Sequence, residues 1–226
     1  GSDNQHAVIT VLGNVNCPAT TNTHDVYWGY GNGDGRYYFT VDLAGSTSSL
    51  TMADGDIYIR SIMKFSGDGD QNITQTAGYF DNAEMYIKSD KIMGSLILQS
   101  DISIAQDFIL ASGTLDLNGY NLTLNTSNSY YQQDGGIFLG TGFSGTGSLT
   151  VYGGCYVYGG TFEAPPVINN YREFHIYSGV TFTHHSGTIT FYANSYDYTI
   201  EGGGKAFYNV IFTKNSGDTR TLWIYN

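Results

Sequence analysis

The chain has 226 residues, a formal net charge of −11 and only 13% charged residues. This length suffices for one domain with a substantial core, and the acidic balance argues against nucleic acid and anionic membrane surfaces as partners. Residues that favour strands outnumber those that favour helices, and 30 glycines with only 3 prolines indicate many turns. We therefore expect an all-β protein, and no apolar run is long enough to predict a membrane span.

The first 50 residues differ in character from the remainder. Apolar segments over 7–12 and 37–43 predict strands, and the tyrosine- and glycine-rich stretch 27–35 between them cannot be helical. We expect residues 1–50 to form an N-terminal cap-like β segment in front of a second region, residues 51–226.

Residues 51–226 contain a series of very short segments in which apolar and polar residues alternate. Glycine, asparagine, aspartate or serine separates each segment from the next. Alternation with period two predicts strands, and strands this short suit a solenoid, whose coils stack about 4.8 Å apart, better than a sandwich. We therefore predict a parallel β-helix. The clearest segments are residues 56–59, 95–98, 101–104, 113–117, 121–124, 148–151, 173–176, 179–182 and 187–191.

Two stretches of the chain resemble each other at an offset of 126 or 127 residues. The match aligns Phe65, Phe80 and Asn82 with Phe191, Phe207 and Asn209. We interpret it as a second repeat unit that begins near residue 190 and is truncated at 226, so that the chain is a piece of a longer repetitive protein. The expected partners are neighbouring repeats of that protein, and an uncovered strand at 222–226 would favour end-to-end self-association.

Three stretches carry a resemblance to a known family. Residues 113–124 read GTLDLNGYNLTL, and residues 186–191 and 206–212 read SGTITF and AFYNVIF. They resemble coils of the right-handed parallel β-helix repeats in large secreted or cell-surface, adhesin-type proteins of Bacteroidetes-like bacteria. The resemblance covers roughly residues 56–226. It implies a right-handed parallel β-helix, a secreted or cell-surface location, a non-catalytic structural or adhesive role and a glycan or cell-surface partner.

One turn has the composition of a cation site. Asp68, Asp70 and Asn72 place oxygen-bearing side chains at alternate positions, and calcium is bound by such oxygens in flexible turns. The EF-hand pattern is incomplete, because Ile73 stands where that loop has glycine. A polar turn between coils explains the same residues, so calcium at Asp68, Asp70 and Asn72 is one of two interpretations, and no other cofactor is expected.

Residues with catalytic chemistry are few. The pair Arg172 and Glu173 lies at a junction between loop and strand, and it suits either an active site or an ordinary surface. His184 and His185 are adjacent, so on a strand they would face opposite sides and would not share a metal ion. We therefore expect no enzyme, with a carbohydrate-active β-helix enzyme (a polysaccharide lyase or hydrolase) or its glycan-binding module as the alternative.

The two cysteines, Cys17 and Cys155, are too few for a disulfide framework. We expect both thiols to be free and buried. A bridge between the two cysteines, which are far apart in the sequence, is the less favoured alternative.

The 20 tyrosines are unusually many for this length. Flat amphipathic rings on a rigid sheet suit contact with sugars or with a protein partner. Ladders of rings stacked between coils would explain the same abundance, and both interpretations remain open. The rings crowd into a few regions at Tyr27, Tyr30, Tyr37, Tyr38, Tyr130, Tyr131, Tyr152, Tyr156, Tyr158, Tyr171, Tyr177, Tyr192, Tyr196 and Tyr198.

Overall fold

The computed structural model describes residues 7–17, 26–28, 39–54, 57–59, 62–80, 84–87, 93–141, 145–192, 198–214 and 221–225. Within this part of the chain every regular element is a β-strand, and every pairing between strands is parallel. Three sheets of ten, eight and six strands, here called sheets 1, 2 and 3, run along the molecule. The protein is a parallel β-solenoid, as its sequence predicts.

Successive coils contribute one strand to each sheet where all three sheets are present. Sheet 1 contains β1 (Ala7–Val11), β4 (Phe39–Leu43), β7 (Ile62–Phe65), β9 (Glu84–Ile87), β12 (Phe108–Leu110), β15 (Tyr130–Gln133), β18 (Gly154–Val157), β21 (Phe174–Ile176), β24 (Tyr198–Glu201) and β26 (Leu222–Tyr225). Sheet 2 contains β2 (Val15–Cys17), β5 (Ser49–Met52), β8 (Gln71–Gln75), β10 (Ser95–Leu98), β13 (Thr114–Asp116), β16 (Ile137–Leu139), β19 (Thr161–Glu163) and β22 (Thr181–Thr183). Sheet 3 contains β11 (Ile102–Ile104), β14 (Asn121–Leu124), β17 (Ser148–Val151), β20 (Val167–Asn170), β23 (Thr188–Tyr192) and β25 (Asn209–Thr213). A separate pair joins β3 (Val26–Trp28) to β6 (Ile57–Ile59).

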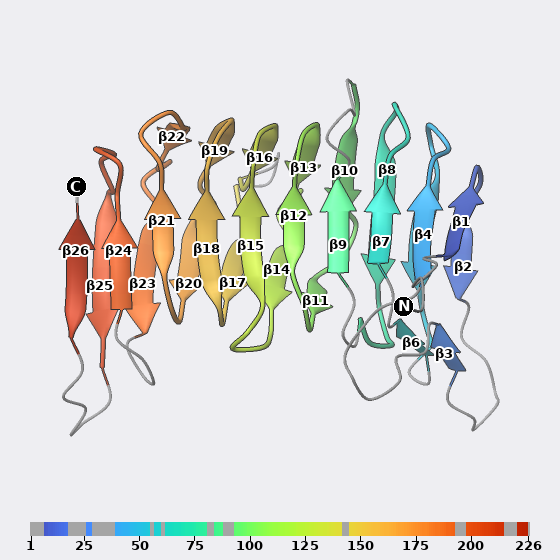
Figure 1. The fold of residues 1–226 in the computed structure, drawn as a ribbon, viewed down its shortest axis with the longest axis horizontal. Coiled ribbons are helices and arrows are strands. Elements are labelled where there is room, and N and C mark those ends of the chain that lie inside the picture. Colours follow the sequence, from blue (N-terminus) through green and yellow to red (C-terminus); the bar gives the residue numbers. More distant parts are fainter. Residues whose placement is uncertain are drawn as a thin grey trace, which may run out of the picture.

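The solenoid winds with a right hand. In Figure 1 the chain rises along the near strands of sheet 1, passes over the top to sheet 2 and descends through sheet 3, while it advances from right to left. This is the hand that nearly all parallel crossover connections adopt, because right-twisted strands pack back onto the sheet only in that way.

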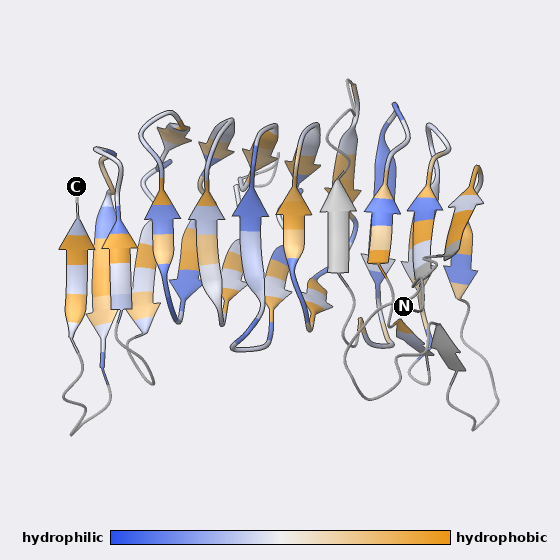
Figure 2. Ribbon diagram, in the orientation of Figure 1, coloured by the Kyte–Doolittle hydropathy of each residue, from blue (hydrophilic) through white to orange (hydrophobic). Residues whose placement is uncertain are grey.

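The core is a set of rows in which equivalent residues of successive coils lie one above another. Leu115 pairs in register with Leu96 on one side and with Phe138 on the other, and all three side chains are fully buried. The Phe138 and Phe162 rings stack at 4.6 Å. Most strands alternate between this interior and the outer surface, which Figure 2 shows as alternating bands of hydropathy along many of the strands.

The corner between sheets 1 and 2 depends on left-handed glycines. Gly94, Gly113, Gly136 and Gly160 each precede a strand of sheet 2 and have φ between 70° and 82°, a region that glycine enters without steric cost. A Cβ on Gly160 would lie 2.2 Å from the carbonyl oxygen of Gly136 in the coil below. The regular glycines of the sequence are therefore what lets the turns of adjacent coils stack closely.

The sheets run without a break through the proposed boundary near residue 50. Strand β1 pairs with β4 in sheet 1, and β2 pairs with β5 in sheet 2, which in turn pairs with β8. The described strands of residues 1–50 in these two sheets therefore pair in parallel with the strands of the next coil, as the later strands do. Tyr30, Tyr37 and Tyr38 lie outside the described residues.

The two matching stretches of sequence do not occupy equivalent places in the fold. Strand β7, which contains Phe65, belongs to sheet 1, whereas β23, which contains Phe191, belongs to sheet 3. Strands β9 and β25, which come later in the two stretches, are divided between sheets 1 and 3 in the same way. The two stretches thus lie on different sides of the solenoid, and the second repeat unit from near residue 190 to 226 stays a prediction.

Candidate functional site

Four aromatic side chains gather on the outer surface of sheet 1, on β18 and β21 and just beyond their ends. They are Tyr156, Tyr158, His175 and Tyr177, and we call them the aromatic platform. Tyr156 pairs in register with His175 on the neighbouring coil, and their ring centres lie 5.4 Å apart. The Tyr158 and Tyr177 centres are 4.8 Å apart, and Tyr156 and Tyr158 are 6.2 Å apart with planes within 8°. Alternation along two adjacent strands thus brings four rings together on one face.

The Tyr156 ring lies against the backbone of its own strand. A Cβ on Gly154 would come within 2.4 Å of the Tyr156 ring, so the ring occupies space that any other residue at position 154 would fill. The Tyr156 hydroxyl donates a hydrogen bond to the Glu173 carboxylate, and the Tyr130 ring meets Tyr156 edge-on at 6.3 Å. Gly154 therefore leaves the space that this orientation of the Tyr156 ring requires.

The surroundings raise the pKa of two phenols of the platform. Burial raises the pKa of Tyr156 well above its usual value, and the hydrogen bond to Glu173 raises it further, while Arg172 acts in the opposite direction. Burial, followed by the charges of Tyr177 and Asp134, raises the pKa of Tyr158. Near neutral pH both phenols are hydrogen-bond donors, and neither is a general base.

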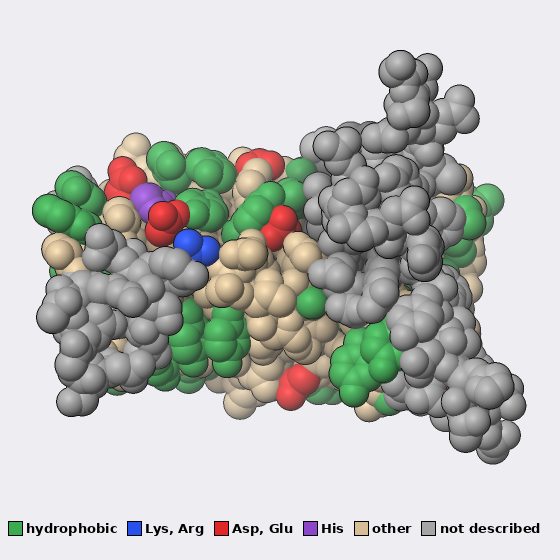
Figure 3. Space-filling model, turned by 60° about the horizontal axis from the view of Figure 1, so that its bottom comes forward, with side chains coloured by type: hydrophobic (Ala, Val, Ile, Leu, Met, Phe, Trp, Pro, Cys, Tyr) green, Lys and Arg blue, Asp and Glu red, His purple; other side chains and the backbone are tan. Residues whose placement is uncertain are grey.

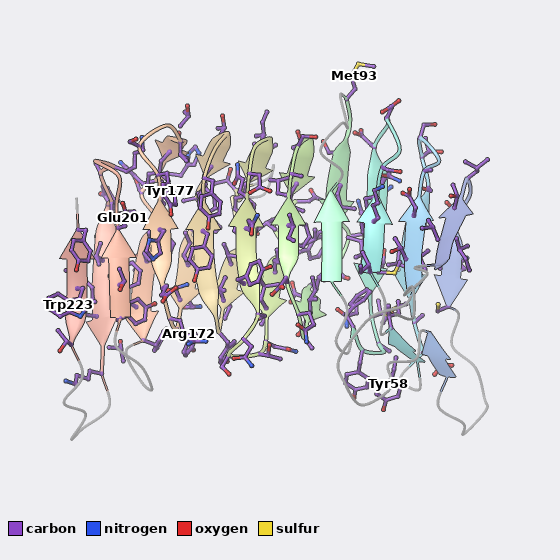
Figure 4. The ribbon with its side chains drawn as sticks, in the orientation of Figure 1. Tyr58, Met93, Arg172, Tyr177, Glu201 and Trp223 are labelled. Carbon is purple, nitrogen blue, oxygen red and sulfur yellow. The ribbon has the colours of Figure 1, made fainter. Side chains whose placement is uncertain are left out.

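Charged groups flank the platform. His175 Nδ1 lies 3.0 Å from Glu201 Oε2 on the next strand. Arg172 Nη1 donates a 2.7 Å hydrogen bond to the backbone oxygen of Ser127. In Figure 4, Arg172 and Tyr177 lie towards opposite ends of β21, with Glu201 on the adjacent strand β24. Figure 3 shows histidine, acidic and basic side chains close together among hydrophobic ones towards the C-terminal end.

A second group of tyrosines stacks at the corner between sheets 3 and 1. Tyr152 and Tyr171 directly follow β17 and β20, and Tyr192 is the last residue of the paired strand β23. We call these three residues the tyrosine ladder. Their ring centres lie 4.3 and 4.4 Å apart with planes within 8°. Burial and the neighbouring Tyr152 raise the pKa of Tyr171 to about 12. These three residues form a ladder of rings stacked between coils, which is one of the two interpretations of the abundant tyrosines.

The oxygens of the predicted calcium turn bind neighbouring protein groups. Asp70 Oδ1 accepts a 2.9 Å hydrogen bond from the backbone N–H of Ser95, and Asn72 Oδ1 accepts one of 2.8 Å from Gln99 Nε2. Asp68 and Asp70 are exposed. Among the described residues no group of three or more histidine, cysteine, aspartate or glutamate side chains is placed to hold a metal ion. Calcium at Asp68, Asp70 and Asn72 remains a prediction, and the polar turn explains the contacts.

The adjacent histidines have separate partners. His184 stacks on Tyr208 at 5.4 Å, and its Nδ1 accepts a hydrogen bond from the backbone N–H of Ser186. His185 Nε2 lies 3.3 Å from Glu163 Oε2. The two rings therefore make different surface contacts, and neither belongs to the aromatic platform.

Both cysteines are free and buried, as expected. Burial raises the pKa of the Cys155 thiol far above its usual value, and burial, followed by the charge of Asp54, raises that of Cys17. Both thiols therefore stay protonated at neutral pH, the state in which a thiol is a poor nucleophile.

A polar hollow of about 480 Å³ lies beside sheet 3, lined by residues that include Gln75, Asp101, Asn121 and Ser148. Its polar groups bind one another. Gln75 Oε1 accepts a hydrogen bond from the backbone N–H of Ser103, Asp101 Oδ1 accepts one from the backbone N–H of Asn121, and the Ser148 hydroxyl donates to Asn121 Oδ1. These hydrogen bonds join successive coils, so the polar residues of the hollow have a structural role.

Comparisons with protein-family models, curated proteins and solved structures find no match to this chain. The described residues also contain no helix long and apolar enough to cross a membrane. The class that the fold defines is that of the parallel β-solenoids.

Proposed function

We propose that the chain is a non-catalytic structural and adhesive module of a large secreted or cell-surface protein. The observation that carries this proposal is the aromatic platform. Its four rings are outward-facing, and the parallel pairing of β18 with β21 fixes where they stand. Rigid rings on a stiff rod form a preorganised surface, which loses little conformational entropy when a ligand binds.

Adhesion without turnover tests this function. Beads coated with the purified chain are expected to adhere to polysaccharide-coated surfaces, and the polysaccharide recovered afterwards is expected to keep its original length. Adhesion no stronger than that of beads coated with an unrelated acidic protein would contradict the adhesive role, and shortening of the polysaccharide would contradict the non-catalytic one.

Exposed apolar residues at the two ends of the solenoid favour a second copy of this chain as a partner. Phe212 and Ile224 continue buried rows of the core, yet they are 51% and 62% exposed. At the opposite end Ile9, which pairs with the buried Val41, is 49% exposed. Apolar strand edges invite pairing with another chain, so we include end-to-end association of two copies in the proposal.

This association is testable by sedimentation. The weight-average mass is expected to rise with protein concentration, and Trp223→Lys, which places a charge on the exposed edge strand β26, is expected to suppress the rise. A mass that stays at 24.7 kDa over the whole concentration range would contradict end-to-end association.

A carbohydrate-active enzyme is the second candidate, and one observation favours it. Arg172, Glu173 and Tyr156 lie together beside His175, and a lyase acting on uronate polymers needs a cation near the substrate carboxylate and groups that move protons. The raised pKa of Tyr156 disfavours it as the base. Release of unsaturated uronate products, followed by ultraviolet absorbance and lost in Arg172→Ala, would establish the enzyme and overturn the non-catalytic proposal.

A further inference from the structure

The aromatic platform leaves ring surface open to solvent. Tyr158 is 44% exposed and Tyr177 38% exposed, although their centres are only 4.8 Å apart and their planes are inclined by 32°. The tilt means that the two rings do not cover each other fully. A ligand with a flat apolar face can therefore gain contact area that the folded chain has not already used.

The surface around the platform is elongated along the solenoid axis. The register aligns Gln132, Tyr156, His175, Glu201 and Tyr225 in one outward row across five successive strands of sheet 1. Neighbouring parallel strands lie about 4.8 Å apart, so the row extends over roughly 19 Å. This shape suits an extended chain that lies across the coils better than a compact small molecule.

The row and the neighbouring Tyr158 combine aromatic rings with hydrogen-bonding groups. Glu201 offers acceptor oxygens, the Tyr158 hydroxyl is a protonated donor, and His175 offers a ring nitrogen. A pyranose sugar has the complementary surface, because its C–H groups form an apolar face and its hydroxyls, which both donate and accept, surround that face. The core of a protein–protein interface is instead depleted of charged residues, so this combination of rings with charged and polar groups favours a sugar over a protein.

The charges near the platform select among sugars. Glu173, Glu201 and Asp134 are acidic, Arg172 is the basic group that acts on Tyr156, and the whole chain carries −11. Uronate or sulfated polymers would approach against this field, whereas an uncharged sugar would not. From the open rings, the elongated row and these charges we infer that the aromatic platform binds an uncharged, extended pyranose oligosaccharide that lies along the solenoid axis. The inference rests on the proposed adhesive function.

Calorimetric titration of the intact chain with a panel of oligosaccharides tests the ligand class. The uncharged probes are cellohexaose, mannohexaose and N-acetylated chitohexaose, and the anionic probes are oligogalacturonate and oligoalginate. At least one uncharged probe is expected to bind, and the anionic probes are expected to bind at least about tenfold more weakly. Equal or tighter binding of the anionic probes, or no binding of any uncharged probe, would overturn the inference.

Two tyrosine variants test the location. Tyr177→Ala is expected to weaken binding of the uncharged probe at least about fivefold, by loss of ring contact. Tyr152→Ala is the matched control, because Tyr152 is 39% exposed but belongs to the tyrosine ladder beyond the other end of β18, and it is expected to change binding less than about twofold. An effect of Tyr152→Ala as large as that of Tyr177→Ala would place the site elsewhere.

The outcomes separate this inference from the proposed function. If coated beads adhere to polysaccharide while Tyr177→Ala binds the uncharged probe as well as the unmodified chain does, the adhesive function stands and the platform is not its site. If the chain shortens the polysaccharide, the non-catalytic function itself is overturned, whatever the platform binds.

Discussion

The tyrosine ladder and the aromatic platform show two uses of the same residue type on one solenoid. In the ladder, Tyr171 is sandwiched between Tyr152 and Tyr192, with ring planes within 8° on both sides. In the platform, Tyr158 and Tyr177 are inclined by 32° and remain well exposed. Tyr171 has both ring faces against tyrosines of adjacent coils, whereas the inclined Tyr158 and Tyr177 rings leave part of their facing surfaces uncovered. We propose that this difference separates a stabilising role from a binding role.

The largest expected effect on stability is at the middle of the ladder. Tyr171→Ala removes two ring stacks, each of which contributes about 1 kcal/mol, so the free energy of unfolding is expected to fall by about 2 kcal/mol in urea unfolding. Tyr177→Ala is the comparison and is expected to cost less than about 1 kcal/mol, because an exposed ring contributes little. Equal losses for the two variants would remove the distinction between ladder and platform.

Gly154→Ala tests how the platform is built. The added Cβ would meet the Tyr156 ring, and because that ring is a surface side chain it can swing away, at the cost of its hydrogen bond to Glu173. We expect a loss of about 1 kcal/mol in the free energy of unfolding and weaker binding of the uncharged oligosaccharide. Gly179→Ala is the control, since nothing lies within 4 Å of its added Cβ, and it should leave both quantities unchanged. Unchanged binding in Gly154→Ala would show that the orientation of Tyr156 does not matter.

Alkaline pH is expected to loosen the ladder. An unfolded tyrosine ionises near pH 10, whereas Tyr171 keeps its proton to about 12. The folded state therefore holds this proton more tightly, so its contribution to stability is complete below about pH 10 and is lost as pH rises towards 12. Urea unfolding across this range is expected to show a falling stability that Tyr171→Phe makes less steep. An identical slope in Tyr171→Phe would contradict the assignment.

The smallest expected effect concerns the ion pair at the edge of the platform. Glu201 is partly exposed, and its contact with His175 is a surface pair, so Glu201→Gln is expected to change the free energy of unfolding by less than about 0.5 kcal/mol. A larger loss, measured by urea unfolding at neutral pH, would mean that the ion pair also stabilises the packing of the platform rings.

Much of the fold follows from local pattern. Alternation over 95–98, 102–104, 121–124 and 148–151 identifies strands that the structure contains, because buried and exposed positions must alternate on a half-buried strand. Strand β15, which reads YYQQ, escapes this rule: Gln133 is inward and fully buried, where it donates a hydrogen bond to the backbone oxygen of Thr161. A buried polar side chain such as Gln133 breaks the alternation of apolar and polar residues from which strands are predicted.

The site was less predictable than the fold. The spacing of Glu173, His175 and Tyr177 marks one face of a strand, but it does not say which residues of other coils lie beside them. That depends on coil length, and the strands of sheet 1 begin at residues 108, 130, 154, 174 and 198, which are not evenly spaced. The partnership of Tyr156 with His175, and the role of Gly154, therefore appear only once the register is known.

Amide chemical shifts can locate the bound oligosaccharide on the surface of the solenoid. The uncharged probe that binds best is titrated into isotope-labelled protein. We expect the largest shift changes at residues 156–158 and 175–177, with further changes along the outward row of sheet 1. Changes centred on the tyrosine ladder, or spread evenly over all three sheets, would contradict the claim that the inclined rings are the binding surface.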